Sequence, residues 1–137
     1  MQNRIIKHSL PGFIKAGIQT GFLVSVVNLL WYFFSVKLLK ITGQDIINPL
    51  SVVISCLVAA LGAALIFYFI FNRIKKPVLS FRGIVFVLAI ASLAMSFRGT
   101  LPDGSPVPDR FSVLSAPMHI FAGLFIGYFI PKFLKGD

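Results

Sequence analysis

Four long apolar stretches, separated by short polar segments, dominate this sequence. Each is close to the roughly 20 residues that a helix needs to cross the hydrocarbon core of a bilayer. We place the four spans at about residues 13–39, 49–71, 82–98 and 110–131. Asn48 and Pro49, together with Asp45, are typical of the start of a helix. Four spans joined by short loops predict one all-α domain over residues 1–137, folded as an antiparallel membrane bundle.

The composition excludes a soluble domain. Hydrophobic residues make up 57% of the chain and charged residues only 12%, about half the charged fraction of an ordinary soluble domain. The chain has no Glu, and four Asp residues are its whole acidic complement. A soluble fold of this size needs more charge to cover its surface. We therefore predict a multi-pass integral membrane protein.

The basic residues predict the orientation of the spans. Although the net charge is +9, the Lys and Arg residues flank the apolar stretches, so we expect no nucleic-acid partner. Nine of the 13 lie in the N-terminal segment, the 72–82 loop and the C-terminal tail, and four lie in the other two loops. The side richer in Lys and Arg is cytoplasmic, so we expect both termini in the cytoplasm. Arg73, Lys75 and Lys76 are placed to contact anionic lipid headgroups.

Small residues predict where the helices pack together, because apolarity does not distinguish the inside of a membrane bundle from its outside. The glycines expected at these contacts are Gly17, Gly21, Gly62 and Gly123. In the second span, the expected packing stripe is Ser51, Ser55, Ala59 and Gly62. In the fourth span, a helical wheel turns Ser112, Ser115, Ala116, His119 and Gly123 inward, and turns Leu114, Met118, Phe121, Phe125 and Phe129 toward lipid.

His119 is the main candidate for chemistry. It follows Arg110 by nine residues, which at 1.5 Å per residue places it roughly 13 Å deep in the membrane. An ionisable residue at that depth is costly unless it is satisfied, and it is a functional hypothesis by default. Asn28 lies at a comparable depth, and the further polar partners are Ser55, Ser92 and Ser115. Pro117 removes a backbone hydrogen bond and predicts a kink beside the histidine.

Two interpretations of this polar group stay open. In the first, His119 and Asn28 form an interhelical hydrogen bond that fixes packing. In the second, they form a polar pocket near the middle of the membrane, of the kind that transporters build from broken helices. Neither a metal nor a cofactor is expected, because the spans offer one His and one Cys. We do not expect an enzyme, because the spans contain no acidic residue that could form a catalytic triad with Ser115 and His119.

The last span carries a resemblance. The stretch APMHIFAGLFIGYFIPKFLKG resembles the last span of an uncharacterised bacterial family of small four-span membrane proteins. In that family a Met-His pair precedes Ala/Gly and a Val/Ile-Pro ending, and the matching positions here are Met118, His119, Ala122, Gly123, Ile130 and Pro131. The resemblance implies a four-span fold and a bacterial inner-membrane location, and it implies no activity.

The function expected from the sequence is association through helices, either as a homo-oligomer or as the small subunit of a membrane complex. The small-residue stripes and the shortage of reactive groups favour it. The alternative is a small-solute or proton carrier that uses the pocket around His119 and Asn28.

The predicted orientation is testable by cysteine labelling in intact cells. In a Cys56→Ser background, an impermeant thiol reagent added from outside is expected to modify Ser105→Cys and to leave Lys75→Cys unmodified, because the positive-inside rule places the 72–82 loop in the cytoplasm. Permeabilised cells, in which both positions react, are the control. Labelling of position 75 but not of position 105 would overturn the orientation.

Overall fold

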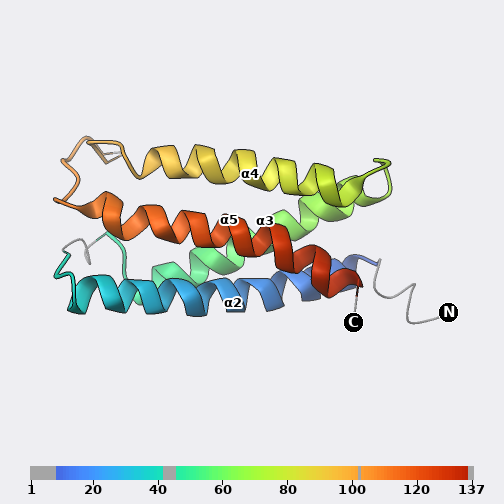
Figure 1. The fold of residues 1–137 in the computed structure, drawn as a ribbon, viewed down its shortest axis with the longest axis horizontal. Coiled ribbons are helices and arrows are strands. Elements are labelled where there is room, and N and C mark those ends of the chain that lie inside the picture. Colours follow the sequence, from blue (N-terminus) through green and yellow to red (C-terminus); the bar gives the residue numbers. More distant parts are fainter. Residues whose placement is uncertain (1–8, 42–45, 102, 136–137) are drawn as a thin grey trace.

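The computed structural model describes residues 9–41, 46–101 and 103–135. Within these ranges the chain forms helices α2 (Leu10–Lys37), α3 (Pro49–Phe71), α4 (Pro77–Met95) and α5 (Phe111–Lys135). All four are long and apolar enough to cross a membrane, which confirms the predicted all-α architecture with four spans (Figure 1). The basic residues Arg4 and Lys7 and the expected cap residue Asp45 lie outside the described residues.

Proline and capping residues fix where the helices begin. Asn48 caps α3, with its Oδ1 accepting from the N–H of Ser51 at 2.9 Å and its own N–H donating to the Ser51 hydroxyl at 3.0 Å. α4 begins at Pro77 and not at residue 82, because Pro suits the first turn of a helix and the charged Arg82 does not interrupt the helix. The Nε of Arg82 donates to the carbonyl oxygen of Gly127 on α5 at 3.2 Å.

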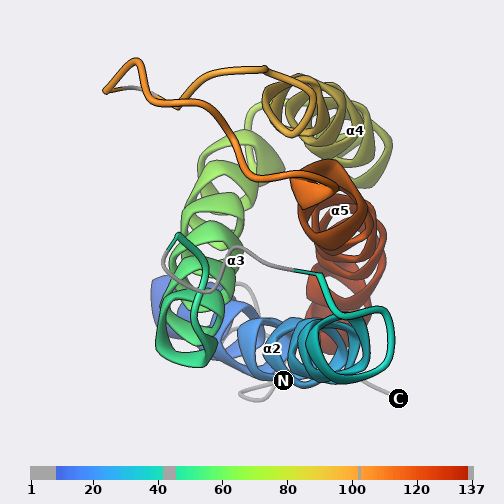
Figure 2. The same ribbon diagram turned by 90° about the vertical axis from the view of Figure 1, so that its left-hand side faces the viewer.

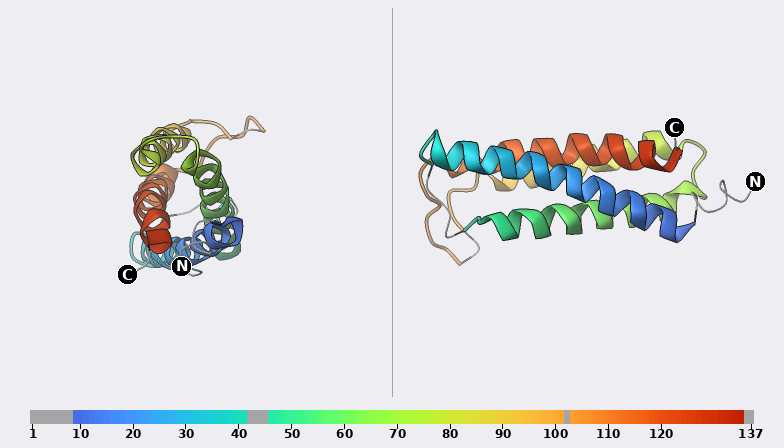
Figure 3. Two further views of the ribbon diagram at one scale, coloured as in Figure 1. Left: turned by 90° about the vertical axis from the view of Figure 1, so that its right-hand side faces the viewer. Right: turned by 90° about the horizontal axis from the view of Figure 1, so that it is seen from below.

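Seen end-on, the four helices are arranged in a ring (Figure 2). α2 packs closely against both α3 and α5, α4 lies against α5, and α3 makes few contacts with α4 and α5. The first turn of α2 and the last turn of α5 lie at the same end of the bundle as the 72–76 loop (Figures 1 and 3). This end is called the 72–76 end below, and the opposite end, where α4 passes to α5, the 98–110 end.

Glycine brings α2 and α3 together. A Cβ atom at Gly17 would lie 2.9 Å from the Cβ of Ala64 and 3.2 Å from the carbonyl oxygen of Ala60. A Cβ atom at Gly21 would lie 2.9 Å from a methyl group of Leu57. These distances are shorter than van der Waals contact, so only glycine permits this approach of the two backbones.

An aromatic cluster joins three helices at the 72–76 end. Phe67 of α3 stacks on Phe81 of α4 with ring centroids 4.4 Å apart, and Phe13 of α2 meets Phe67 edge-on at 5.4 Å. All three side chains are fully buried. Aromatic pairs in these geometries contribute about 0.5–1.5 kcal/mol beyond the area they bury. The aromatic cluster therefore holds α3 and α4 together at this end.

Two predicted helix faces are wrong. On α5, Leu114 and Met118 are buried and not lipid-facing, because α5 packs on one side against α2 and on another against α4. The exposed face of α5 consists instead of Val113, Ile120, Leu124 and Tyr128. On α3, no helix covers the expected stripe. The buried residues lie one position further along the helix, at Val52, Cys56, Ala60, Ala64 and Phe67.

The four glycines expected at helix contacts do not all lie at such contacts. Gly17 and Gly21 lie between α2 and α3, and a Cβ at Gly123 would come within 2.7 Å of the Ala89 Cβ on α4. A Cβ at Gly62 would meet nothing within 4 Å, because this face of α3 is turned toward α4 and α5, with which α3 makes few contacts. Gly62 is consequently not a packing glycine in this chain.

Substitution by alanine separates the two kinds of glycine. Gly17→Ala is expected to lower the free energy of unfolding by about 1–3 kcal/mol, since the new methyl group overpacks a rigid contact. Gly62→Ala is the matched control and is expected to change stability by no more than a gain of about 1 kcal/mol from helix propensity. Unfolding by SDS titration in mixed micelles measures both. Equal effects at the two positions would contradict the close approach of α2 and α3.

Candidate functional site

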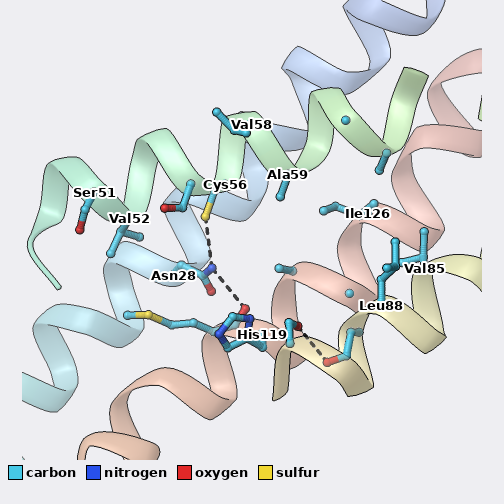
Figure 4. A pocket seen from close by; sticks show the side chains of 18 of the residues that line it. Asn28, Ser51, Val52, Cys56, Val58, Ala59, Val85, Leu88, His119 and Ile126 are labelled. Atoms are coloured by element: carbon cyan, nitrogen blue, oxygen red, sulfur yellow. Dashed lines mark hydrogen bonds between the residues drawn. The ribbon is translucent and has the colours of Figure 1, made fainter. Parts of the chain in front are cut away.

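The bundle encloses a cavity of about 660 Å³ between α3 on one side and α4 and α5 on the other. This volume falls within the range of about 300–1,000 Å³ that is typical of small-molecule sites. Most of the lining is apolar, and none of the described residues in it is charged. Figure 4 shows Asn28, Cys56 and His119 gathered in one part of the cavity, with Val85 and Ile126 further along it.

Asn28 is the best-held polar side chain in the cavity wall. Only 3% of its surface is exposed, and its Nδ2 donates to the Sγ of Cys56 and to the carbonyl oxygen of Met118, both at 3.3 Å. One amide thus links α2 to α3 and α5. Its Oδ1 is buried and has no hydrogen-bond partner among the described residues. Asn28 therefore keeps an unsatisfied acceptor buried in the cavity wall, with almost no surface of that atom exposed to the cavity itself.

His119 lines the same cavity at the same level of the bundle. It directly follows Met118, whose carbonyl oxygen receives the Asn28 amide, and it lies roughly 12 Å from the start of α5. The expected hydrogen bond between His119 and Asn28 is not formed, because the amide N–H groups are directed to Cys56 and Met118 instead. Within the described residues, the imidazole makes no hydrogen bond, and its polar atoms are left for the cavity.

The three candidate serines have different positions. Ser55 and Ser92 line the cavity from α3 and α4, and the Ser92 hydroxyl donates to the carbonyl oxygen of Ala89 at 2.9 Å. Ser115 is buried on α5 and is not part of the lining. Its Oγ has no partner among the described residues. Four of the five candidate residues thus surround one cavity, and Ser115 lies apart from it.

Pro117 lies inside α5, which continues through it as a single helix. Proline deprives the carbonyl of Val113 of its usual donor, and the predicted kink at this position stays a prediction. At the neighbouring carbonyl, Leu114, the indole N–H of Trp31 donates from α2 at 3.1 Å. Trp31 therefore joins α2 to α5 beside the proline.

Sequence reasoning missed residues that carry no polar signal. Cys56 reads as a small hydrophobic residue, and its contact with Asn28 arises only where α2 crosses α3. Val58 and Leu88, which are 64% and 51% exposed, line the cavity from α3 and α4. Their exposure shows that the cavity opens sideways between these two helices. Because both helices are apolar enough to span a membrane, that opening faces the bilayer.

Comparison of the chain with protein-family models, with curated proteins and with solved structures found no match. The resemblance of the last span to a family of small four-span proteins therefore stays a prediction. The geometry of the cavity is the guide to the function of this chain.

Cys56 is the sole cysteine of the chain and reports on the cavity directly. In lipid nanodiscs, N-ethylmaleimide is expected to modify Cys56 at least about tenfold faster than a cysteine of similar burial outside the cavity, because thiol modification depends on access. The matched control is Ser35→Cys in a Cys56→Ser background, since Ser35 is fully buried on α2 and does not line the cavity. Mass spectrometry gives both rates at one pH. Equal rates would contradict an accessible cavity.

Proposed function

We propose that this membrane protein binds a small, uncharged and mainly apolar molecule in the cavity between α3 and α4–α5. The observation that supports this most strongly is a cavity of about 660 Å³ with an unsatisfied Asn28 acceptor in its wall. Ligand sites combine an apolar lining with a few well-placed polar groups, and Asn28 and His119 supply such groups here.

The lining favours a solute over a proton as the bound species. Of the described residues that line the cavity, His119 and Cys56 are the titratable ones, and none carries a carboxylate. A chain of titratable groups is the usual feature of an intramembrane proton path. Of the two species that the carrier hypothesis allowed, the proposal therefore keeps a small solute and drops the proton.

A second candidate function is association with another membrane helix. It is favoured by the α3 stripe of Ser55, Ala59 and Gly62, which lines the cavity and on which none of the four described helices packs. Small residues permit close helix approach in bilayers. A helix from another copy or from a larger complex would then take the place of the small molecule.

Filling the cavity tests the proposal. A photoreactive eight-carbon hydrocarbon bearing a diazirine, added to the protein in nanodiscs, is expected to label segments 55–63 and 118–123 saturably. Gly62→Trp is expected to remove this labelling, because its side chain occupies open cavity space. Gly83→Trp is the matched control, since Gly83 is equally uncrowded but exposed outside the cavity. Peptide mass spectrometry maps the labelled residues.

The same samples distinguish the two candidates. Labelling that never saturates, or that survives Gly62→Trp, would refute a small-molecule site. A homo-oligomer in wild-type nanodiscs that dissociates in Gly62→Trp, but not in Gly83→Trp, would support helix association instead. Mass photometry of the nanodiscs measures that change.

A further inference from the structure

The orientation of the Asn28 amide decides what the cavity offers to a ligand. Its Nδ2 points to the carbonyl oxygen of Met118 and to the sulfur of Cys56. A flipped amide would place Oδ1 against the Met118 carbonyl, and two acceptors would then face each other. The Oδ1 atom is thus fixed as the group without a partner among the described residues, in a side chain that is only 3% exposed. A buried acceptor of this kind costs about 1–3 kcal/mol unless a donor reaches it.

His119 complements this acceptor. A neutral imidazole presents one N–H donor and one nitrogen acceptor, and the ring lines the cavity at the level of Asn28. A hydroxyl group both donates and accepts. Because Oδ1 itself has almost no exposed surface, a small movement of the surrounding side chains is needed to open it. One hydroxyl placed here would then donate to Asn28 Oδ1 and accept from the N–H of His119, so that both polar groups of the wall are satisfied together.

The lining disfavours a charged head group. Among the described residues, no Lys, Arg, Asp or Glu lines the cavity, and a carboxylate, phosphate or ammonium group buried without a counter-charge is far more costly than a neutral hydroxyl. The remainder of the cavity, toward the 72–76 end, is lined by Ala63, Ile66, Val85 and Ile126. From Cys56 to Ile66 it extends roughly 15 Å along α3, which is space for a hydrocarbon chain.

We infer that the cavity selects a neutral lipid alcohol, with the hydroxyl group between Asn28 and His119 and the hydrocarbon chain extending toward Val85 and Ile126. The inference rests on the proposed function and names its ligand class. The sideways opening between Val58 and Leu88 lets such a molecule pass from the bilayer without crossing water. A hydroxyl could also come from a water molecule at the same place, and the experiment separates the two sources.

Three matched probes test the inference in nanodiscs: dodecan-1-ol, dodecane and dodecanoate, each bearing a diazirine at the same carbon. Labelling of segments 55–63 and 118–123 is measured against the mole fraction of probe in the bilayer. The alcohol is expected to reach half-saturation at about one-tenth the mole fraction that dodecane needs, as one additional hydrogen-bonded group predicts. Asn28→Leu is expected to abolish this advantage, and His119→Phe to reduce it. Labelling by dodecane should persist in both variants and serves as the control for folding.

Each other outcome overturns the inference in a distinguishable way. Equal half-saturation of alcohol and dodecane in the wild type would mean that water or nothing satisfies Asn28, and it would leave the cavity site standing. Stronger labelling by dodecanoate would refute selection for a neutral head group. Absence of saturable labelling by all three probes would refute both the inference and the proposed function. The ratio of the half-saturation mole fractions of dodecan-1-ol and dodecane, measured in the wild type, tests the inference even where a variant fails to fold.

Discussion

The close contact of α2 with α3 at Gly17 and Gly21 is the constraint on which the rest of the structure depends. Because neither glycine has a side chain, the two backbones approach until Ala60 and Ala64 lie directly against α2. That contact commits one face of α3 to α2. The adjoining face, which contains Gly62, lines the cavity as a result.

The cavity exists because the helices are held together unequally along their length. At the 72–76 end, the stacked rings of Phe67 and Phe81 join α3 to α4, and Phe13 adds α2 to the same cluster. Toward the 98–110 end, α4 is held mainly by α5, where Gly123 approaches Ala89. The helices α3 and α4 therefore separate beyond the aromatic cluster, and the space between them opens to the bilayer.

Polar side chains in this bundle join helices through hydrogen bonds, and some of their hydrogen-bonding atoms are left without a partner among the described residues. Asn28 joins three helices through one amide and retains a buried acceptor. Trp31 joins α2 to α5 at a carbonyl close to Pro117. In the hydrocarbon core of a bilayer there is no bulk water to donate a hydrogen bond to such an acceptor. The proposed preference for a neutral hydroxyl rests on this acceptor and on His119, which lie at the same level of the cavity wall.

The sequence by itself determined the number of spans and their all-α nature, because a run of about 20 apolar residues has few other uses. It also singled out Asn28 and His119 as polar residues within such runs, and both line the cavity. It did not determine which faces meet. Inside a bilayer both the core and the lipid side are apolar, so Leu114 and Met118 carried no signal of their burial. Only the tertiary structure decided that Gly62 faces a cavity while Gly17 faces a helix. That distinction depends on the angle between α3 and its neighbours, which long-range contacts set and local sequence does not encode.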